Sequence, residues 1–249
     1  MKILLSNDDG FNAPGIKILE NALKDYGNVI LAAPNKNVSA CSSSLSVHNN
    51  IKIKKIDSNH YIVYGTPADC VHVLSRGIMK SPPDIVFSGI NYGSNMGDDV
   101  IYSGTVAAAI EGRFYKYSPI AISIASSEPK YLNDIDIKIE FIIKFIMNAK
   151  YMLDVIFNIN IPDIPFKSLR GIKFTTLGKR TISKKPKINY EDETITSSIG
   201  PVGRFKEKKF SSDIVAIESG YISITPITTN MCDIDLYKKL SKKNVKFKI

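Results

Sequence analysis

The residues near the start of the chain that are best suited to chemistry are two adjacent carboxylates, Asp8 and Asp9, which precede the turn-forming Gly10. They follow the apolar run Ile3-Leu4-Leu5, which predicts a short strand buried on both faces of a parallel sheet. Ligands of open α/β sheets bind beyond the carboxyl ends of the strands, where this pair would lie. Adjacent carboxylates repel each other unless a cation is near, and their hard oxygens suit Mg²⁺ or Mn²⁺. An ordinary solvated turn fits the same residues equally well.

Two further polar segments are predicted to reach the same edge of the sheet. The stretch 35–46 is rich in serine, including Ser39, and follows a buried strand predicted over Asn28–Ala33. Composition alone favours a flexible serine loop at this place. The segment Asn91–Asn95 also follows a predicted strand. Its glycine would let the backbone approach a ligand closely, and its two asparagines supply neutral polar groups.

The segment Ser103-Gly104-Thr105 is expected to open a helix that runs to Gly112. Such a helix end offers backbone N–H groups, hydroxyl donors and a favourable dipole to an anion. A well-capped, alanine-rich core helix would explain the serine and threonine as well. Each cluster is weak alone, but together they supply anionic ligands, neutral oxygens and an anion-binding helix end. This combination suits a cation and a phosphate held side by side.

The elements that would position these residues follow an alternating strand and helix pattern. Apolar residues at helical spacing from Ile16 to Tyr26 lie between two buried strands, which predicts a right-handed crossover and a parallel sheet. The sequence therefore predicts the α/β class. Further strands are predicted at 51–56, 60–65, 84–87, 120–125, 158–161 and 171–175, and further helices at 66–78, 103–112 and 135–146.

The second half of the chain has a different character. We expect residues 1–150 to carry the active site, and residues 151–249 to add sheet strands, hairpin arms and a C-terminal segment within a single domain overall. The stretch Lys179–Phe210 lacks helical periodicity and is interpreted as extended arms outside the main sheet. Apolar residues alternate from Ser211 to Ile227, and a short basic helix is predicted from Asp233.

The composition narrows the class of protein. The 249 residues carry a formal net charge of +9, which would attract phosphate-bearing ligands. We expect no binding to nucleic acid, because no recognisable motif accompanies the charge. No apolar run approaches the ~20 residues of a membrane helix, and no signal peptide is evident, so we expect no membrane association. The three widely spaced cysteines indicate reduced thiols in a cytoplasmic protein.

Two other groups of titratable residues are assigned no part in the chemistry. His48, His60 and His72 are scattered, and we interpret them as surface or core residues. Asp98 and Asp99 lie past the glycine-containing stretch, and we expect them to cap or charge the following segment rather than bind metal.

Short blocks along almost the whole chain follow, in order, the pattern of a known family. They are Lys2-Ile3-Leu4, Asn7-Asp8-Asp9-Gly10, Gly15-Ile16, Ala33-Pro34, Ser39, Gly65-Thr66-Pro67-Ala68-Asp69-Cys70-Val71, Ser88-Gly89-Ile90-Asn91-Tyr92-Gly93-Ser94-Asn95-Met96-Gly97, Tyr102-Ser103-Gly104-Thr105-Val106, Glu111-Gly112, Pro119-Ile120-Ala121, Asn158-Ile159-Asn160-Ile161-Pro162 and Gly220-Tyr221-Ile222-Ser223-Ile224-Thr225-Pro226. The sequence thus resembles the SurE family, the survival-protein family of divalent-metal-dependent nucleoside monophosphate phosphatases.

The resemblance implies an enzyme of the 5′-nucleotidase type, which hydrolyses nucleoside 5′- or 3′-monophosphates to nucleoside and phosphate. Short polyphosphate is a further candidate substrate. By position, one Mg²⁺ or Mn²⁺ per subunit would be held by four residues, and the two carboxylates among them would also be catalytic. The implied metal ligands are Asp8, Asp9, Ser39 and Asn91, and the implied phosphate contacts are Asn95, Ser103, Gly104 and Thr105.

The resemblance also implies the fold and the assembly. It predicts a Rossmann-like, mostly parallel sheet flanked by helices, with a projecting β-hairpin and a C-terminal arm, in a homodimer or homotetramer. The arm region Lys179–Phe210 matches the family's pattern least well. In the serine loop, the segment Cys41-Ser42-Ser43-Ser44 offers a rival hydroxyl to that of Ser39.

Two alternative functions use the same residues differently. A strand that ends in an acidic pair also opens receiver domains, which use Mg²⁺ to accept a phosphoryl group on a third aspartate. This chain has no clear candidate for that aspartate and is twice the usual length of a receiver. The second alternative is a basic nucleic-acid-binding module, whose signature would be steeply salt-dependent binding without turnover.

Overall fold

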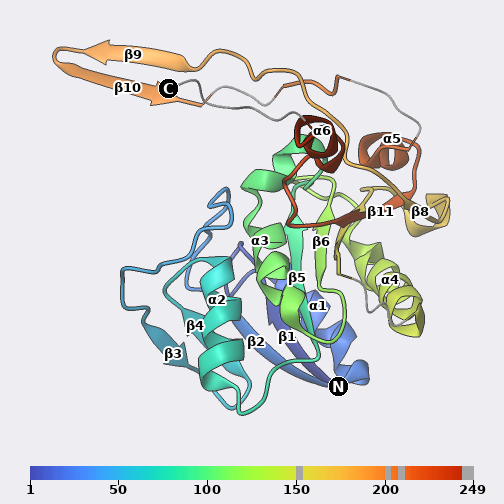
Figure 1. Ribbon diagram of the computed structural model, residues 1–249. Helices are drawn as coiled ribbons and strands as arrows, with labels where there is room; N and C mark the ends of the chain where they lie inside the picture. Colours follow the sequence, from blue (N-terminus) through green and yellow to red (C-terminus); the bar gives the residue numbers. More distant parts are fainter. Residues whose placement is uncertain (150–153, 200–202, 207–210, 243–249) are drawn as a thin grey trace.

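The computed structural model describes residues 1–149, 154–199, 203–206 and 211–242, and it places a sheet between two layers of helices (Figure 1). In this part of the chain nine strands form one sheet in the order β3-β4-β2-β1-β5-β6-β7-β11-β8. Neighbouring strands are parallel except in the β3–β4 and β7–β11 pairs. The strands are β1 (Lys2–Ser6), β2 (Asn28–Pro34), β3 (Ile53–Lys55), β4 (His60–Val63), β5 (Ile85–Tyr92), β6 (Ile120–Ile124), β7 (Ile156–Ile161), β8 (Ile172–Phe174) and β11 (Ile222–Ile227), with β9 (Lys187–Glu191) and β10 (Thr194–Ser198) in a separate hairpin.

Helices cover both faces of the sheet because successive strand residues point to opposite sides. Ile3 and Leu5 of β1 pack in a cluster with α1 and α4, whereas Leu4 packs with α2 and α3. The helices are α1 (Pro14–Leu23), α2 (Pro67–Val73), α3 (Gly104–Glu111), α4 (Ile135–Ala149), α5 (Asp213–Glu218) and α6 (Ile234–Leu240). Short helical turns are η1 (Lys24–Tyr26), η2 (Leu74–Ile78), η3 (Gly97–Tyr102), η4 (Gly112–Phe114), η5 (Leu132–Asp134) and η6 (Phe166–Ser168).

The predicted α/β class with its mostly parallel sheet is confirmed, and two local predictions need correction. The strand predicted over 51–56 is only the three-residue β3, which pairs antiparallel to β4 at the sheet edge. The alternating pattern over 211–227 did not predict α5. The Ser212 side chain caps this helix by accepting a hydrogen bond from the Val215 N–H at 3.3 Å, and Gly220 follows its end with a φ of +81°.

Strands from both predicted parts of the chain lie in the same sheet, since β7, β8 and β11 continue the series that β1 begins. The division at residue 150 itself stays a prediction. Within the described residues, no helix has both the length and the apolar character that crossing a membrane requires.

A two-stranded hairpin, β9 and β10, projects away from the sheet (Figure 1). Every residue of both strands is exposed. The prediction of extended arms over 179–210 is confirmed for the described part, while 200–202 and 207–210 lie outside the described residues. The predicted C-terminal helix is present as α6, with no buried residue, and the basic stretch that follows at 243–249 also lies outside the described residues.

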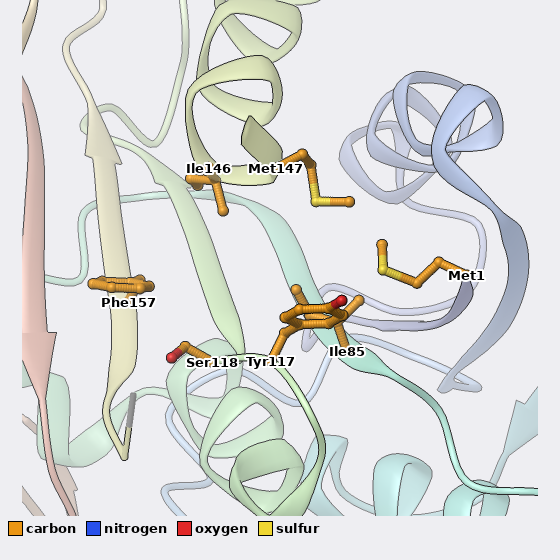
Figure 2. Close-up of a pocket in the computed structure, with 7 residues that line it drawn as sticks. All are labelled: Met1, Ile85, Tyr117, Ser118, Ile146, Met147 and Phe157. Carbon is orange, nitrogen blue, oxygen red and sulfur yellow. The ribbon is translucent and has the colours of Figure 1, made fainter. Parts of the chain in front are cut away.

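One hollow among the described residues lies at the opposite edge of the sheet from the acidic pair. A small apolar cavity of about 40 Å³ lies at the amino-terminal ends of the strands. Figure 2 shows the side chains that line it, which are Met1, Ile85, Tyr117, Ser118, Ile146, Met147 and Phe157. Because this lining carries no charge, the cavity does not suit a phosphate ester.

His60, the first residue of β4, is held between two carboxylates and makes stability depend on pH. Its Nε2 lies 2.9 Å from Glu20 Oε1, and its Nδ1 lies 2.9 Å from both Asp57 oxygens. Burial lowers the pKa of His60, but the hydrogen bonds to Asp57 and Glu20 outweigh it, so the net pKa is raised. A raised folded-state pKa stabilises the fold below the ordinary histidine pKa of about 6.5 and loses that effect as pH rises through the folded value.

We therefore expect the melting temperature to fall between about pH 6 and pH 8, and to fall less in His60→Gln, whose side chain does not titrate. Thermal unfolding of both proteins at each pH measures this difference. Equal pH profiles for the two proteins would show that the charge on His60 contributes nothing.

Candidate metal and phosphate site

The turn after β1 is held by the buried Asn7, which fixes the two carboxylates that follow. Its amide nitrogen donates to the Gly10 carbonyl at 3.0 Å, and its amide oxygen accepts from the Gly10 N–H at 3.1 Å. Gly10 has a φ of +102°, which favours glycine over residues with a side chain. Asp8 and Asp9 therefore lie in a rigid loop at the carboxyl end of the strand, as the sequence predicts.

Asp8 connects the end of β1 to the start of α3. Only 4% of Asp8 is exposed, and its Oδ1 accepts a hydrogen bond of 2.5 Å from the Thr105 hydroxyl. A Cβ atom on Gly104 would lie 2.8 Å from the Asp8 Cβ, so only glycine lets the helix end approach this closely. Burial raises the pKa of Asp8, and hydrogen bonds, above all that from Thr105, partly offset the increase.

Asp9 is the more exposed carboxylate of the pair. Burial and the neighbouring charge of Asp8 raise its pKa to about 6, against a hydrogen bond from the Tyr92 backbone that lowers it. The Tyr92 contact places Asp9 beside the end of β5, next to Asn91. Two carboxylates whose charged forms are both disfavoured by their surroundings are well suited to a cation, which would reverse that preference.

Asn91 lies where the pairing of β5 with β6 is irregular. The register shifts between Ser88 and Asn91, which is the mark of a bulge, and bulges next to functional sites often redirect a side chain. The Asn91 amide nitrogen donates to the Gly93 carbonyl at 2.7 Å. The amide oxygen is the atom of this side chain that could serve a cation.

The serine loop reaches the acidic pair through its backbone and through Asn37. The Val38 N–H donates to the Asp8 carbonyl at 2.9 Å, and the Asn37 amide nitrogen lies 3.4 Å from Asp9 Oδ1. The exposed Ser39 follows, with its hydroxyl donating to the Asn37 amide oxygen at 2.6 Å. The loop therefore lies at the edge of the sheet that its position in the sequence indicates.

Two of the hydroxyls that could take the place of the Ser39 hydroxyl already donate to backbone carbonyls. Ser42 donates to the Ile101 carbonyl at 2.6 Å, and Ser44 donates to the Cys41 carbonyl at 3.0 Å. Cys41 itself lies at the site, since its Sγ would be 3.2 Å from a Cβ on Gly104. Sequence reasoning did not foresee this thiol beside Asp8, because nothing in the local pattern fixes how the loop folds back.

The amino-terminal end of α3 supplies the proposed phosphate contacts. The Ser103 hydroxyl caps the helix by accepting from the Val106 N–H at 3.1 Å, which leaves its own proton for another acceptor. The Thr105 hydroxyl donates to Asp8 and so links the helix to the acidic pair, while the contact of Thr105 with phosphate stays a prediction. Of the backbone N–H groups in the first turn, that of Thr105 bonds to Asp8 and that of Val106 to Ser103, which leaves the Gly104 N–H for an anion.

Asn95 is buried and tied to strands that sequence reasoning did not connect with the site. Its side-chain nitrogen donates to the Ser123 hydroxyl at 2.8 Å, and its backbone N–H donates to the Asn160 amide oxygen at 2.9 Å. The amide nitrogens of Asn158 and Asn160 both donate to the Asn95 carbonyl. The two asparagines of the buried strand were the sequence signal for this connection, because buried amide groups need hydrogen-bond partners.

Asp98 and Asp99 are acidic residues in the first turn of η3, as expected, and they also hold the arm region. The Arg180 N–H donates to Asp98 Oδ2 at 2.9 Å, and the Arg180 guanidinium forms an ion pair with Asp99. His72 Nδ1 lies 2.8 Å from Glu111 Oε1. In the described residues, no group of three or more histidine, cysteine or carboxylate side chains is placed to hold a metal. A cation at Asp8 and Asp9 would thus take neutral oxygens as its remaining ligands, which fits Mg²⁺ or Mn²⁺.

Comparison with known proteins identifies close relatives. The family model described as "Survival protein SurE" matches residues 3–184. The chain is 42% identical over 243 residues to "5'-nucleotidase SurE" of Legionella pneumophila (strain Paris), covering 97% of this chain and 96% of that protein. It is also 42% identical over 234 residues to "5'-nucleotidase SurE" of Idiomarina loihiensis, covering 93% of each. The crystal structure of the SurE protein from Aquifex aeolicus superposes with a TM-score of 0.84 at 35% identity, covering 97% of this chain and 99% of that one.

Proposed function

The chain belongs to the SurE family, and we propose that it is a metal-dependent phosphatase that hydrolyses nucleoside 5′- or 3′-monophosphates to nucleoside and phosphate. The observation that carries the proposal is the 2.5 Å hydrogen bond between Thr105 and Asp8. It joins the acidic pair to a helix N-terminus, so ligands for a cation and for a phosphate lie side by side. The receiver-like alternative is not favoured by the family or by the relatives.

The proposed cofactor is one Mg²⁺ or Mn²⁺ per subunit, held by Asp8, Asp9, Ser39 and Asn91. A bound cation of this kind neutralises phosphoryl oxygens and lowers the pKa of a water ligand. The carboxylates supply hard anionic oxygens, and the serine hydroxyl and the asparagine amide supply neutral ones.

The chain's own groups bind the phosphate and handle the proton. Ser103, Asn95, Thr105 and the backbone N–H group of Gly104 hold the phosphoryl oxygens and stabilise charge as the P–O bond breaks. Asp9, the more exposed carboxylate, orients the attacking water or accepts its proton. The mechanism needs no histidine or cysteine nucleophile.

Phosphate release tests the proposal. Protein treated with a chelator should release no phosphate from a panel of nucleoside 5′- and 3′-monophosphates, and Mg²⁺ or Mn²⁺ should restore the release. Including short polyphosphate in the panel decides whether it is a second substrate. Activity that survives both the chelator and Asp9→Ala would refute the proposal.

We also propose that the chain forms a homodimer or homotetramer through the hairpin. Ile188 and Tyr190 share one face of β9, and Ile195 of β10 pairs opposite Tyr190, so an exposed apolar face results. An isolated two-stranded hairpin is marginally stable in water, which supports a second copy of the chain as its partner. Three free cysteines support the further proposal of a cytoplasmic location.

Replacing Ile195 by glutamate is expected to lower the molar mass measured by light scattering, because it places a charge in the apolar face. Thr196→Glu is the matched control, since the next residue of β10 points to the opposite, polar face of the hairpin. An unchanged mass in Ile195→Glu, or an equal loss in both variants, would exclude this face as the interface.

A further inference from the structure

A second buried carboxylate, Asp213, lies outside the acidic pair at the start of α5. None of its surface is exposed. Three backbone N–H groups donate to it: those of Gly97 at 2.8 Å, Gly178 at 2.9 Å and Ile214 at 2.8 Å. Burying a carboxylate is costly unless hydrogen bonds satisfy it, so a fully buried one marks a place where the fold depends on those bonds.

The three donors belong to segments far apart in the sequence. Gly97 begins η3, the short helix that leads from Asn95 to Ser103, and both of those residues are proposed phosphate contacts. Gly178 precedes the hairpin arm, and Ile214 belongs to α5. One carboxylate therefore connects the phosphate end of the site to two segments more than eighty residues further along the chain.

The backbone of Gly97 meets that of Gly178 directly, and Gly178 lies against the side chain of Ile214. A Cβ on Gly97 would lie 2.9 Å from the Gly178 carbonyl oxygen, and one on Gly178 would lie 2.1 Å from Ile214 Cδ1. Arg180 adds a second tie, because its N–H donates to Asp98 and its guanidinium pairs with Asp99. Residues 97–99 are thus held against residues 178–180 from two sides.

We propose that Asp213 is a positioning residue for the phosphate end of the site: by holding Gly97 it fixes the segment between Asn95 and Ser103. The inference rests on the proposed function. Asp213 touches neither the acidic pair nor any proposed phosphate contact directly, and it acts through the backbone. Groups fixed in advance bind a phosphate without reordering, and a displacement of about 1 Å can reduce a rate a hundredfold.

Asp213 is expected to act mainly on phosphate binding and not on metal binding. Asp8, Asp9 and Asn91 are positioned by Asn7, Thr105, Tyr92 and Gly93, none of which Asp213 contacts. Loss of the Asp213 bonds should therefore weaken the binding of nucleotide and of inorganic phosphate more than the binding of Mn²⁺, which depends on this segment only through Thr105.

Asp213→Asn tests the proposal, with Ser212→Ala as the matched control. The asparagine keeps the shape but replaces one acceptor oxygen with a donor, so at least one of the three N–H bonds is lost. Ser212→Ala removes the cap of the same helix and leaves the Gly97 contact in place. We expect Asp213→Asn alone to raise KM and the inhibition constant of inorganic phosphate about tenfold to a hundredfold, with a smaller change in kcat.

Hydrogen exchange supplies a measurement that needs no activity. Amides of residues 95–103 should exchange faster in Asp213→Asn than in wild type, whereas Ser212→Ala should affect α5 alone. Equal kinetics and equal exchange in the two variants would overturn the proposal. A wild-type protein that releases no phosphate would instead contradict the proposed function.

If Asp213→Asn does not fold, Asp99→Asn provides a second test. Asp99→Asn weakens the other tie on the same segment at a partly exposed position. We expect it to change exchange over 95–103 and phosphate inhibition in the same direction and by less. No change in either quantity would overturn the proposal.

Discussion

Replacing Asp8 by asparagine is expected to abolish metal binding and turnover while making the metal-free protein more stable. The substitution keeps an oxygen that can accept the Thr105 hydrogen bond but removes the negative charge. Burial raises the pKa of Asp8, so its charged form destabilises the fold at neutral pH, and the neutral amide relieves this. It also removes the repulsion that Asp9 experiences.

Asp8→Asn is thus expected to lower turnover and to raise stability, and the two quantities are measured separately. Turnover should fall about a thousandfold or more, because a metal supplies several kcal/mol of transition-state stabilisation and each 1.36 kcal/mol is tenfold in rate. The melting temperature without metal should rise by about 3 °C, the scale of a 1 kcal/mol gain in a chain of this length. A variant that loses both activity and stability would indicate that Asp8 is needed for the fold and not for a cation.

Adding a single methyl group at Gly104 is expected to cause the second-largest loss of activity. The new Cβ would lie 2.8 Å from Asp8 Cβ, 3.0 Å from Asp8 Oδ2 and 3.2 Å from Cys41 Sγ. Either Asp8 or the start of α3 must then move, which breaks the alignment of the carboxylate with the helix end. We expect kcat/KM in Gly104→Ala to fall about a hundredfold, the effect of a misplacement of ~1 Å.

Gly77→Ala is the matched control, because a Cβ there meets nothing within 4 Å. It should leave kcat/KM unchanged and alter the melting temperature little. Full activity in Gly104→Ala would show that the close approach of α3 to Asp8 is not required.

The main sheet could be predicted because its signals are local. Unbroken apolar runs such as Ile3-Leu4-Leu5 fix the buried strands, and Thr66 and Ser103 mark helix starts that the structure confirms with side-chain caps. The convergence of Asp8, Asn91 and the serine loop followed from one rule, which places the ends of parallel strands at one edge.

The pairings within the site could not be predicted, because they join residues far apart in the sequence. The Thr105 hydroxyl bonds to Asp8 across 97 residues, a contact that the position of this threonine in the sequence does not reveal. Gly97 bonds to Asp213 across 116 residues. The helix α5 escaped detection because its six residues are too few to show a helical period against an alternating background.

Titration of Mn²⁺ into the metal-free protein tests the central claim most directly, namely that polar side chains from separate segments surround one cation. We expect one Mn²⁺ per chain in wild type, with binding lost in Asp8→Asn, weakened in Asn91→Ala and unaffected in the Gly77→Ala control. Binding of Mn²⁺ that is equally strong in wild type, Asp8→Asn and Asn91→Ala would contradict it.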